Sequence, residues 1–392
     1  MKICAVVCEY NPFHNGHLYH LSEIKKQSDC DTLLCIMSGN FTQRGEIALM
    51  NKYTRAQHAI HGGADIVLEL PTVFATAPAE IFASGAIKLL SEIPAVKYLS
   101  FGTERGTKED FLSTAKALIT ETKEFKNQLK DELKDGKSLA KAKNAAIKAL
   151  GIEGVDLQLL NSPNSILGIE YTKAILNYDS DIEILPILRI GGGYNDTTPY
   201  NNFSSASSIR QGMLVGNKKV VKHNVPNFVY KNIDYIVPNA DEFIFYSLLT
   251  RTTEEISEII DCTEGLENRI KALMKDSLSF KELTNKIATK RYTNTRINRI
   301  CLSAFLNIKE EFIRKCLKSD LYLKVLAIKD KRMDLLSEIK NSCKLPLLTR
   351  KSDYRLLNGF QTECFDKDIE AGDIYNFITK QKNNEFIMPI VK

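Results

Sequence analysis

The sequence predicts an α/β protein, in which a doubly wound domain with a parallel sheet precedes a mainly α-helical domain. Short apolar runs alternate with helix-period segments through the first part of the chain, which is typical of a parallel sheet covered by helices on both faces. Strand-like runs become rare after about residue 220. A length of 392 residues also exceeds what one hydrophobic core usually serves. We therefore expect two domains, residues 1–220 and 221–392.

The first domain is predicted from its apolar runs in chain order. Each run is short and is bounded by polar or turn-forming residues, as buried strands are. The expected strands are Lys2–Cys8, Thr32–Met37, Asp65–Leu70, Lys97–Phe101 and Glu183–Ile190. The segments between them have helical spacing. The expected helices are His17–Gln27, Lys52–His61, Ala79–Ser91, Asn164–Asn177 and Ser204–Met213.

Two further regions have helical composition. Residues 108–149 are rich in Lys, Glu and Ala and predict amphipathic helices packed on the sheet. The second domain is predicted from six segments with mostly helical spacing. These are Asp241–Leu249, Thr253–Ile260, Gly265–Met274, Ser279–Ala288, Asn294–Ile308 and Ser319–Leu326.

Composition narrows the class of protein. The apolar run Ile3–Cys8 is too short for a signal peptide, and no run approaches the ~20 apolar residues that span a bilayer. The nine cysteines are scattered without CxxC spacing, which indicates a reduced, cytoplasmic protein. We expect no membrane association, and nothing in the sequence implies a stable protein partner. The net charge of +5 is modest and does not by itself indicate a nucleic-acid partner.

One segment carries recognisable chemistry, between the first strand and the first helix: Glu9-Tyr10-Asn11-Pro12-Phe13-His14-Asn15-Gly16-His17. In an open α/β sheet, ligands bind at the carboxyl ends of the strands, and a helix N-terminus there attracts anions. His14 and His17 can face one phosphate chain and stabilise charge at an attacked α-phosphate. Gly16 allows close backbone approach. Two histidines at a helix start are also compatible with a simple helix cap.

The segment VVCEYNPFHNGHLYHL (residues 6–21) resembles the HxGH nucleotidyltransferase superfamily, and more closely the tRNA(Met) cytidine acetate ligase family. The resemblance continues in order through Met37–Pro71, Ser100–Glu104, Ser162–Tyr171 and Phe203–Met213, and more weakly through Lys290–Ile300. Ordered blocks over about three quarters of the chain are far more specific than HxGH alone. The fold that this resemblance implies is a Rossmann-like HxGH nucleotidyltransferase domain.

The resemblance implies an enzyme that makes acetyl-adenylate from ATP and acetate and then acetylates N4 of the wobble cytidine of elongator tRNA(Met). It implies an ATP site with His14 and His17 as catalytic residues. The other implied ATP-binding residues are Val7, Cys8, Glu9, Tyr10, Asn11, Pro12, Phe13, Asn15, Gly16, Leu18, Tyr19, His20, Gly102, Asn164, Arg189 and Ile190.

The match has two departures. Asn11 stands where many HxGH transferases have Asp, and Ile47 replaces an expected Pro. Neither removes an obvious catalytic group, although the first affects how metal is held. We expect Mg²⁺ to accompany ATP, and the sequence identifies no ligands for it.

Further contacts are predicted from smaller elements. Ser207 and Arg210 lie in an (S/T)xxIR-like element whose helix start would meet the β- and γ-phosphates. The loop SGNFTQRGE after the second strand is placed to hold acetate, with Ser38, Asn40 or Gln43 as ligands and Arg44 nearby. A loop-stabilising hydrogen bond is the alternative role for each of these residues.

A basic segment with an interleaved aromatic residue is the candidate for binding tRNA phosphates. Its residues are Lys286, Lys290, Arg291, Tyr292, Arg296 and Arg299, with no acid between them. Tyr292 would stack on a base. A solvated helix face is the alternative interpretation.

Two other function classes stay open at this point. A small-metabolite adenylyltransferase would use the same ATP site without RNA, but such enzymes rarely need the roughly 170 residues after the first domain. A nucleotide-sensing RNA-binding protein without catalysis would not require both His14 and His17. Release of pyrophosphate that depends on acetate separates the first from the ligase, and any covalent turnover excludes the second.

Overall fold

The computed structural model describes residues 1–119, 122–135, 137, 139–190, 205–233 and 238–392. A mixed sheet runs in the order β5-β4-β1-β2-β3-β6-β7, and β8 also pairs with β6. The first five strands in this order are mutually parallel, and β6 runs antiparallel to β3. The strands are β1 (Ile3–Cys8), β2 (Thr32–Ser38), β3 (Ile66–Leu70), β4 (Val96–Thr103), β5 (Glu183–Leu188), β6 (Leu323–Lys329), β7 (Leu347–Leu348) and β8 (Ile390–Val391).

Helices cover both faces of the sheet, as the sequence predicts. Those up to residue 230 are α1 (Asn15–Gln27), α2 (Lys52–His61), α3 (Thr72–Ala75), α4 (Ala79–Ser91), α5 (Lys108–Leu118), α6 (Lys123–Lys134), α7 (Leu139–Ala149), α8 (Pro163–Asn177), α9 (Ala206–Leu214), α10 (Lys218–Asn224) and α11 (Asn227–Tyr230).

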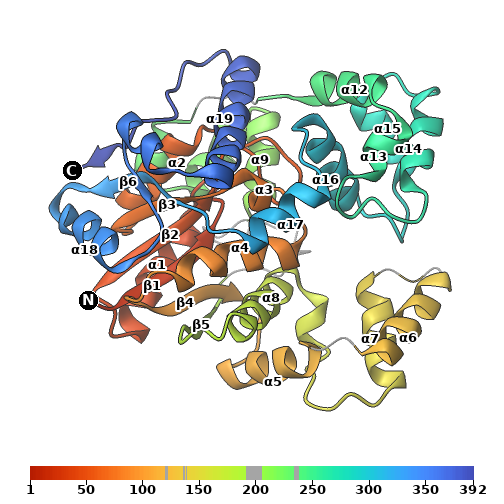
Figure 1. Cartoon of the computed structure of the whole chain (residues 1–392), viewed down its shortest axis with the longest axis horizontal. Helices are drawn as coiled ribbons and strands as arrows, with labels where there is room; N and C mark the ends of the chain where they lie inside the picture. Colours follow the sequence, from red (N-terminus) through yellow and green to blue (C-terminus); the bar gives the residue numbers. More distant parts are fainter. Residues whose placement is uncertain (120–121, 136, 138, 191–204, 234–237) are drawn as a thin grey trace.

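The later helices are α12 (Asp241–Thr250), α13 (Thr253–Ser257), α14 (Leu266–Met274), α15 (Phe280–Ile287), α16 (Asn294–Phe305), α17 (Glu310–Lys318), α18 (Asp334–Ser342) and α19 (Gly359–Thr379). Short 3₁₀ helices occur at Leu159–Asn161, Asp330–Arg332 and Lys351–Leu356. In Figure 1, α12 to α16 form a group beside the sheet, and α6 and α7 lie at another corner of the molecule.

The alternation of side chains along β1 creates two cores. Ile3 and Ala5 belong to the core that also holds α4 and α8. Cys4, Val6 and Cys8 belong to the core on the opposite face, which holds α1 and α2. Burial of both faces explains why the strands read as continuous apolar runs.

One predicted element is wrong. Ser319–Leu326 was expected to be helical, but its second half, Leu323–Leu326, lies in β6, which pairs with β3. The strands β6, β7 and β8 therefore return the end of the chain to the sheet. The division at residue 220 stays a prediction about domains, and the part after it combines helices α11 to α19 with the strands β6, β7 and β8.

No helix in the described part of the chain is long and apolar enough to cross a membrane.

Candidate active site

The HxGH segment forms the turn from the carboxyl end of β1 into α1. Tyr10 has a left-handed backbone with φ 47°, which is costly for a residue with a Cβ and needs support from its surroundings. That support comes from aromatic packing, because the Tyr10 ring lies 4.8 Å from Phe13 and 4.7 Å from His17. Phe13 itself is fully buried. Tyr10 and Phe13 therefore support the turn from the core side.

The two motif histidines cap α1. His14 is the N-cap residue, and its Nδ1 accepts a hydrogen bond from the Gly16 N–H at 3.1 Å. The His14 N–H donates in return to His17 Nδ1 at 3.2 Å. The two rings stack with centroids 3.6 Å apart. The capping interpretation and the catalytic one are thus compatible, because capping uses only the Nδ1 atoms.

Capping also determines which nitrogen of each ring carries a proton. Burial lowers the pKa of His14 to about 3, with further lowering by Arg189 and Arg210. Burial, followed by His14, Arg189 and His20, lowers the pKa of His17 well below 6.5. Both rings are therefore neutral at pH 7. Since each Nδ1 is an acceptor, the ring proton sits on Nε2, and each Nε2–H is left as a hydrogen-bond donor.

Gly16 has a local reason to be glycine. A Cβ at this position would lie 2.9 Å from His14 Cε1 and 3.1 Å from His14 Nδ1. A side chain there would displace the capping imidazole. Gly16 therefore makes room for His14, whereas the sequence argument assigned it to close approach of a ligand.

Arg189 and Arg210 bring positive charge to the histidines from two other elements. Arg189 directly follows β5, is exposed, and its side chain would contact a Cβ built on Gly102 at 3.4 Å. Its neighbour Ile190 is 51% exposed. Arg210, on α9, donates to the Asn11 carbonyl at 3.2 Å and to Ser207 Oγ at 3.2 Å. The predicted phosphate-binding element therefore contacts the HxGH turn.

Asn164 is held by a carboxylate that the sequence analysis missed. Its Nδ2 donates to Glu104 Oε1 at 2.5 Å, and Ser162 Oγ donates to Glu104 Oε2 at 2.8 Å. Glu104 follows β4, so it joins the start of α8 to the carboxyl edge of the sheet. The sequence signal for Glu104 was its place in the Ser100–Glu104 block of the family resemblance.

The other residues of the predicted ATP-binding stretch are of two kinds, some buried beneath the turn and some partly exposed on its surface. Asn11 is buried, and Val7 and Cys8 end β1. Leu18 is 38% exposed, and Asn15 Nδ2 donates to the His223 carbonyl at 3.1 Å. Pro12 and Tyr19 lie in the turn and on α1 respectively.

His20 is half-buried and neutral. Burial and Arg189 lower its pKa to about 4. Its Nε2 lies 2.9 Å from Ser100 Oγ, which itself donates to the Leu185 carbonyl at 2.9 Å. His20 thereby links α1 to β4 and β5.

The predicted acetate residues differ in how their polar groups are used. Asn40 Oδ1 accepts from the Lys52 N–H at 2.9 Å, and the Gln43 N–H donates to Glu9 Oε1 at 2.7 Å. Ser38 is fully buried, and its hydroxyl has no hydrogen-bond partner in the described part of the chain. Arg44 is half-buried in the same loop. A buried hydroxyl without a partner is unusual, so the acetate contact of Ser38 stays a prediction that its unpaired hydroxyl supports.

Arg55 is a second residue that the sequence analysis missed. It lies on α2 with no exposed surface. Its guanidinium donates to the carbonyls of Glu9, Ser38 and Gly39, and its Nε donates to the Met50 carbonyl at 2.9 Å. Arg55 therefore fixes the ends of β1 and β2 relative to each other, and with them the HxGH turn and the predicted acetate loop.

A buried network of four charges lies beneath this loop. Lys52 Nζ contacts Glu69 at 2.7 Å and also pairs with Glu385, while Lys324 Nζ contacts Glu69 at 3.0 Å and Glu385 at 2.7 Å. All four side chains are at most 4% exposed. The sequence signal for this network was the presence of charged residues inside the apolar strands β3 and β6, because a buried charge requires a partner.

The residues that the structure describes form no protein-held Mg²⁺ site. The described ranges contain no cluster of three or more His, Cys, Asp or Glu side chains that would hold a metal. Asn11, at the position of the expected Asp, uses its Oδ1 to accept from the Leu49 N–H at 2.9 Å.

Most of the positive charges in the predicted tRNA-binding segment are paired with acidic side chains from outside the segment. Asp261 pairs with Arg296 and Arg299 at 3.3 Å each. Arg291 pairs with Glu264, and Lys286 pairs with Glu282 at 2.8 Å. Lys290 is exposed, and no ion pair involves it among the described residues.

The same segment contacts the predicted acetate loop. Gly45 has φ 74°, and a Cβ there would lie within 3.0 Å of the backbone of Asn298 and Arg299 on α16. Tyr292, close to the start of α16, lies below the guanidinium groups of Arg291 and Arg296 at 5.9 and 5.5 Å. The helical group α12 to α16 therefore borders the candidate active site.

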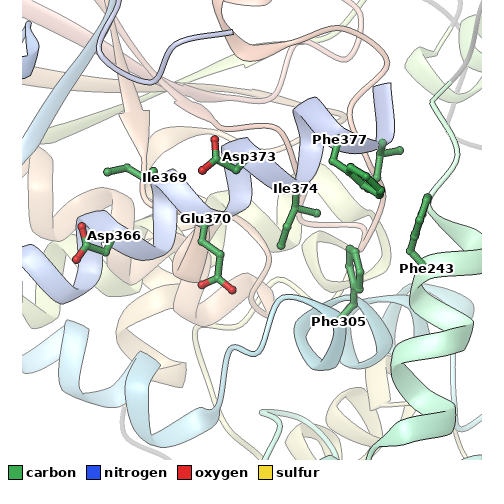
Figure 2. Close-up of a pocket in the computed structure, with 9 residues that line it drawn as sticks. Phe243, Phe305, Asp366, Ile369, Glu370, Asp373, Ile374 and Phe377 are labelled. Atoms are coloured by element: carbon green, nitrogen blue, oxygen red, sulfur yellow. The ribbon is translucent and has the colours of Figure 1, made fainter. Parts of the chain in front are cut away.

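A separate cavity of about 560 Å³ contains none of the predicted site residues. Figure 2 shows Asp366, Glu370 and Asp373 along α19, with Phe305 and Phe243 facing Phe377 at one end. Three carboxylates make this cavity unsuitable for an anionic nucleotide.

Comparison with known proteins agrees with this geometry. The family model HIGH Nucleotidyl Transferase matches residues 1–387. The chain is 37% identical to the tRNA(Met) cytidine acetate ligase of Thermosipho melanesiensis, covering 100% of this chain and 99% of the relative. It is 38% identical to that of Acetivibrio thermocellus, over 96% of this chain and 94% of the relative.

Solved structures show the same similarity. Thermotoga maritima TmcAL bound with alpha-thio ATP superposes with a TM-score of 0.89 at 29% identity, and the apo form superposes with 0.92 at 30% identity. Each comparison covers 100% of both chains. The chain belongs to the HIGH nucleotidyl transferase family and, within it, to the tRNA(Met) cytidine acetate ligases.

Proposed function

We propose that this protein is an ATP-dependent tRNA acetate ligase, which makes acetyl-adenylate and then acetylates N4 of the wobble cytidine of elongator tRNA(Met). The observation that carries the proposal is the pair of neutral histidines that cap the start of α1, with Arg189 and Arg210 beside them. The identity of the RNA comes from the names of the relatives.

In the first step, an acetate oxygen attacks the α-phosphate of ATP and pyrophosphate leaves. Negative charge grows on the phosphate oxygens, and donors fixed in advance stabilise it. His14 and His17 supply two Nε2–H donors on a helix N-terminus, and the two arginines supply charge. Mg²⁺ enters this proposal as part of the substrate, held by the phosphates of ATP.

Acetate is expected to bind at the end of β2. The unpaired Ser38 hydroxyl is a donor for its carboxylate, and Arg55 holds the surrounding carbonyls in place. Activation is required because acetate does not react with an amine at neutral pH, whereas a mixed anhydride with AMP has a good leaving group.

The RNA is expected to approach from the side of α12 to α16, because Gly45 joins α16 to the acetate loop. Lys290 and Tyr292 are the residues best placed for a phosphate and a base. A wobble base lies in an exposed loop and reaches a pocket without opening a duplex. We propose a cytoplasmic enzyme that acts without a stable protein partner.

The test is mass spectrometry of nucleosides from unmodified bulk tRNA incubated with the protein, ATP, Mg²⁺ and acetate. N4-acetylcytidine is expected only when ATP and acetate are both present, and His17→Ala should abolish it. ATP cleavage to AMP without RNA modification would keep the adenylating site but reject the RNA acceptor. Absence of both, with folded protein and competent tRNA, would leave the non-catalytic RNA-binding class.

A further inference from the structure

Acyl transfer to an amine requires a group that accepts a proton, and the motif histidines cannot serve. Each Nδ1 already accepts a backbone hydrogen bond, from Gly16 N–H to His14 and from His14 N–H to His17. Each neutral ring therefore presents only the Nε2–H donor. The base for the second step has to come from another residue near the turn.

Four described carboxylates lie at the ends of β1, β3 and β4 or in the loop after β2, and three of them are engaged. Glu46 pairs with Arg210 at 3.2 Å. Glu69 is buried between two lysines. Glu104 accepts from the side chains of Ser162, Asn164 and Ser165.

Glu9 is the fourth carboxylate, at the end of β1 and five residues before His14. It is half-buried, and its Oε1 accepts from the Gln43 N–H at 2.7 Å. Its other oxygen has no hydrogen-bond partner and no ion pair within the described ranges. A carboxylate is also a poor neighbour for ATP phosphates, so a contact with ATP does not explain why an acid stands in this turn.

We propose that Glu9 is the general base of the transfer step, accepting a proton from the exocyclic amine of the target cytosine. The inference rests on the proposed function and adds a catalytic residue to it. A carboxylate also accepts hydrogen bonds from cytosine N4 in direct base recognition, so Glu9 would orient the amine and select cytosine against uracil, which has a carbonyl there.

The step balances without another reactant. The N4 lone pair forms a bond to the acetyl carbon, and the bond between that carbon and the phosphate oxygen breaks. The bonding electron pair leaves with AMP. One proton passes from nitrogen to the Glu9 carboxylate and then to water.

The surroundings of Glu9 favour this role. Burial raises its pKa above 4.5, partly opposed by the Gln43 N–H and then by Arg210 and Arg44. The charged and titratable groups that face it are Arg210 on α9, Arg44 and Glu46 on the acetate loop, Tyr171 on α8, and Arg55 on α2, which binds the Glu9 carbonyl. A raised pKa makes a carboxylate a stronger base, provided that it is ionised at the working pH.

The test isolates the second step by supplying synthetic acetyl-adenylate and unmodified tRNA to the full-length protein in single turnover. Glu9→Gln keeps an oxygen for the Gln43 N–H but removes the base. We expect its transfer rate to fall about 10²- to 10⁴-fold. The wild-type rate should rise with pH through the raised pKa of Glu9, and the Glu9→Gln rate should lose that rise.

Glu46→Gln is the matched control, because it removes the neighbouring carboxylate and should keep a rate that rises with pH. The rise should move to lower pH, since Glu46 is one of the groups that raise the pKa of Glu9. Circular dichroism and thermal unfolding establish that both variants fold, and Glu9→Asp should recover part of the pH dependence. A Glu9→Gln rate within a few-fold of wild type, with an unchanged pH profile, would overturn the proposal. Absence of transfer by the wild type would instead reject the acetate ligase function, and the role of Glu9 with it.

Discussion

The buried four-charge network gives a prediction whose size follows from the structure. Glu385 contacts both Lys52 and Lys324, and its side chain is 4% exposed. Burial alone would raise its pKa, but the two lysines lower it to about 2. Glu385→Gln would leave two buried ammonium groups to share the single carboxylate of Glu69. Removing one member of a buried ion pair costs about 3–5 kcal/mol.

The assay is urea unfolding at pH 7, followed by circular dichroism. We expect the free energy of unfolding to fall by about 3–5 kcal/mol. Glu363→Gln is the matched control, because Glu363 is 59% exposed and its pair with Lys315 spans 3.5 Å. Exposed pairs contribute about 0–1 kcal/mol, so the control should change little.

Charge balance provides a second check on the network. Glu385→Gln combined with Lys324→Met restores neutrality, so the double variant should lose less stability than the sum of the two single variants. The stabilisation by Glu385 should be present above pH 4.5 and disappear as the pH falls towards 2, because its folded pKa is depressed. A loss below 1 kcal/mol for Glu385→Gln, or strict additivity, would refute the reasoning.

Three further predictions concern the turn, the loop and the histidines. His14→Ala removes the α1 cap, so we expect the free energy of unfolding in urea to fall by about 0.5–2 kcal/mol. The same change removes one hydrogen-bond donor, so acetate-dependent pyrophosphate release should fall about 10²- to 10³-fold. Unchanged release would exclude a catalytic role for His14. Gly45→Ala should lower the thermal midpoint more than Gly151→Ala, because both have positive φ but only Gly45 abuts another backbone; equal midpoints would contradict that contact. Burial lowers the pKa of His14 to about 3 in the folded protein, so the free energy of unfolding of the wild type should fall as the pH drops from 6.5 towards 3. An NMR titration showing His14 protonated at pH 6 would contradict its burial.

Elements with a clear period were predictable from the sequence. Helices α2 and α4 have the predicted bounds, Lys52–His61 and Ala79–Ser91. Helix α1 begins two residues earlier than expected, because His14 acts as its cap. Histidine is not among the preferred capping residues, so sequence preferences did not locate this start.

Strand β6 shows why the hydrophobic pattern alone did not predict the type of element correctly. The strand LKVLAIK is almost wholly buried, and a continuous apolar run does not distinguish a buried strand from a buried helix. Lys324 also interrupted the run. Its burial became intelligible only with Glu69 and Glu385, which lie 255 and 61 residues away in the chain.

The same limitation applies to the site. The HxGH turn and its neighbours were predictable because they are contiguous or belong to ordered blocks. The neutralisation of Arg296 and Arg299 was not, because Asp261 lies outside the basic segment. The roles of Arg55 and Glu104 also depend on contacts between segments far apart in the sequence.

The central claim is that acetate attacks the α-phosphate of ATP at the HxGH turn, and oxygen isotopes test it most directly. The protein would be incubated with ATP, unmodified tRNA and acetate carrying ¹⁸O at both oxygens, and the AMP analysed by mass spectrometry. Attack by acetate predicts that AMP gains one ¹⁸O atom, because the bridging oxygen stays with the phosphate when the amine takes the acetyl group. AMP formed without ¹⁸O, or ¹⁸O found in inorganic phosphate alongside ADP, would contradict the account.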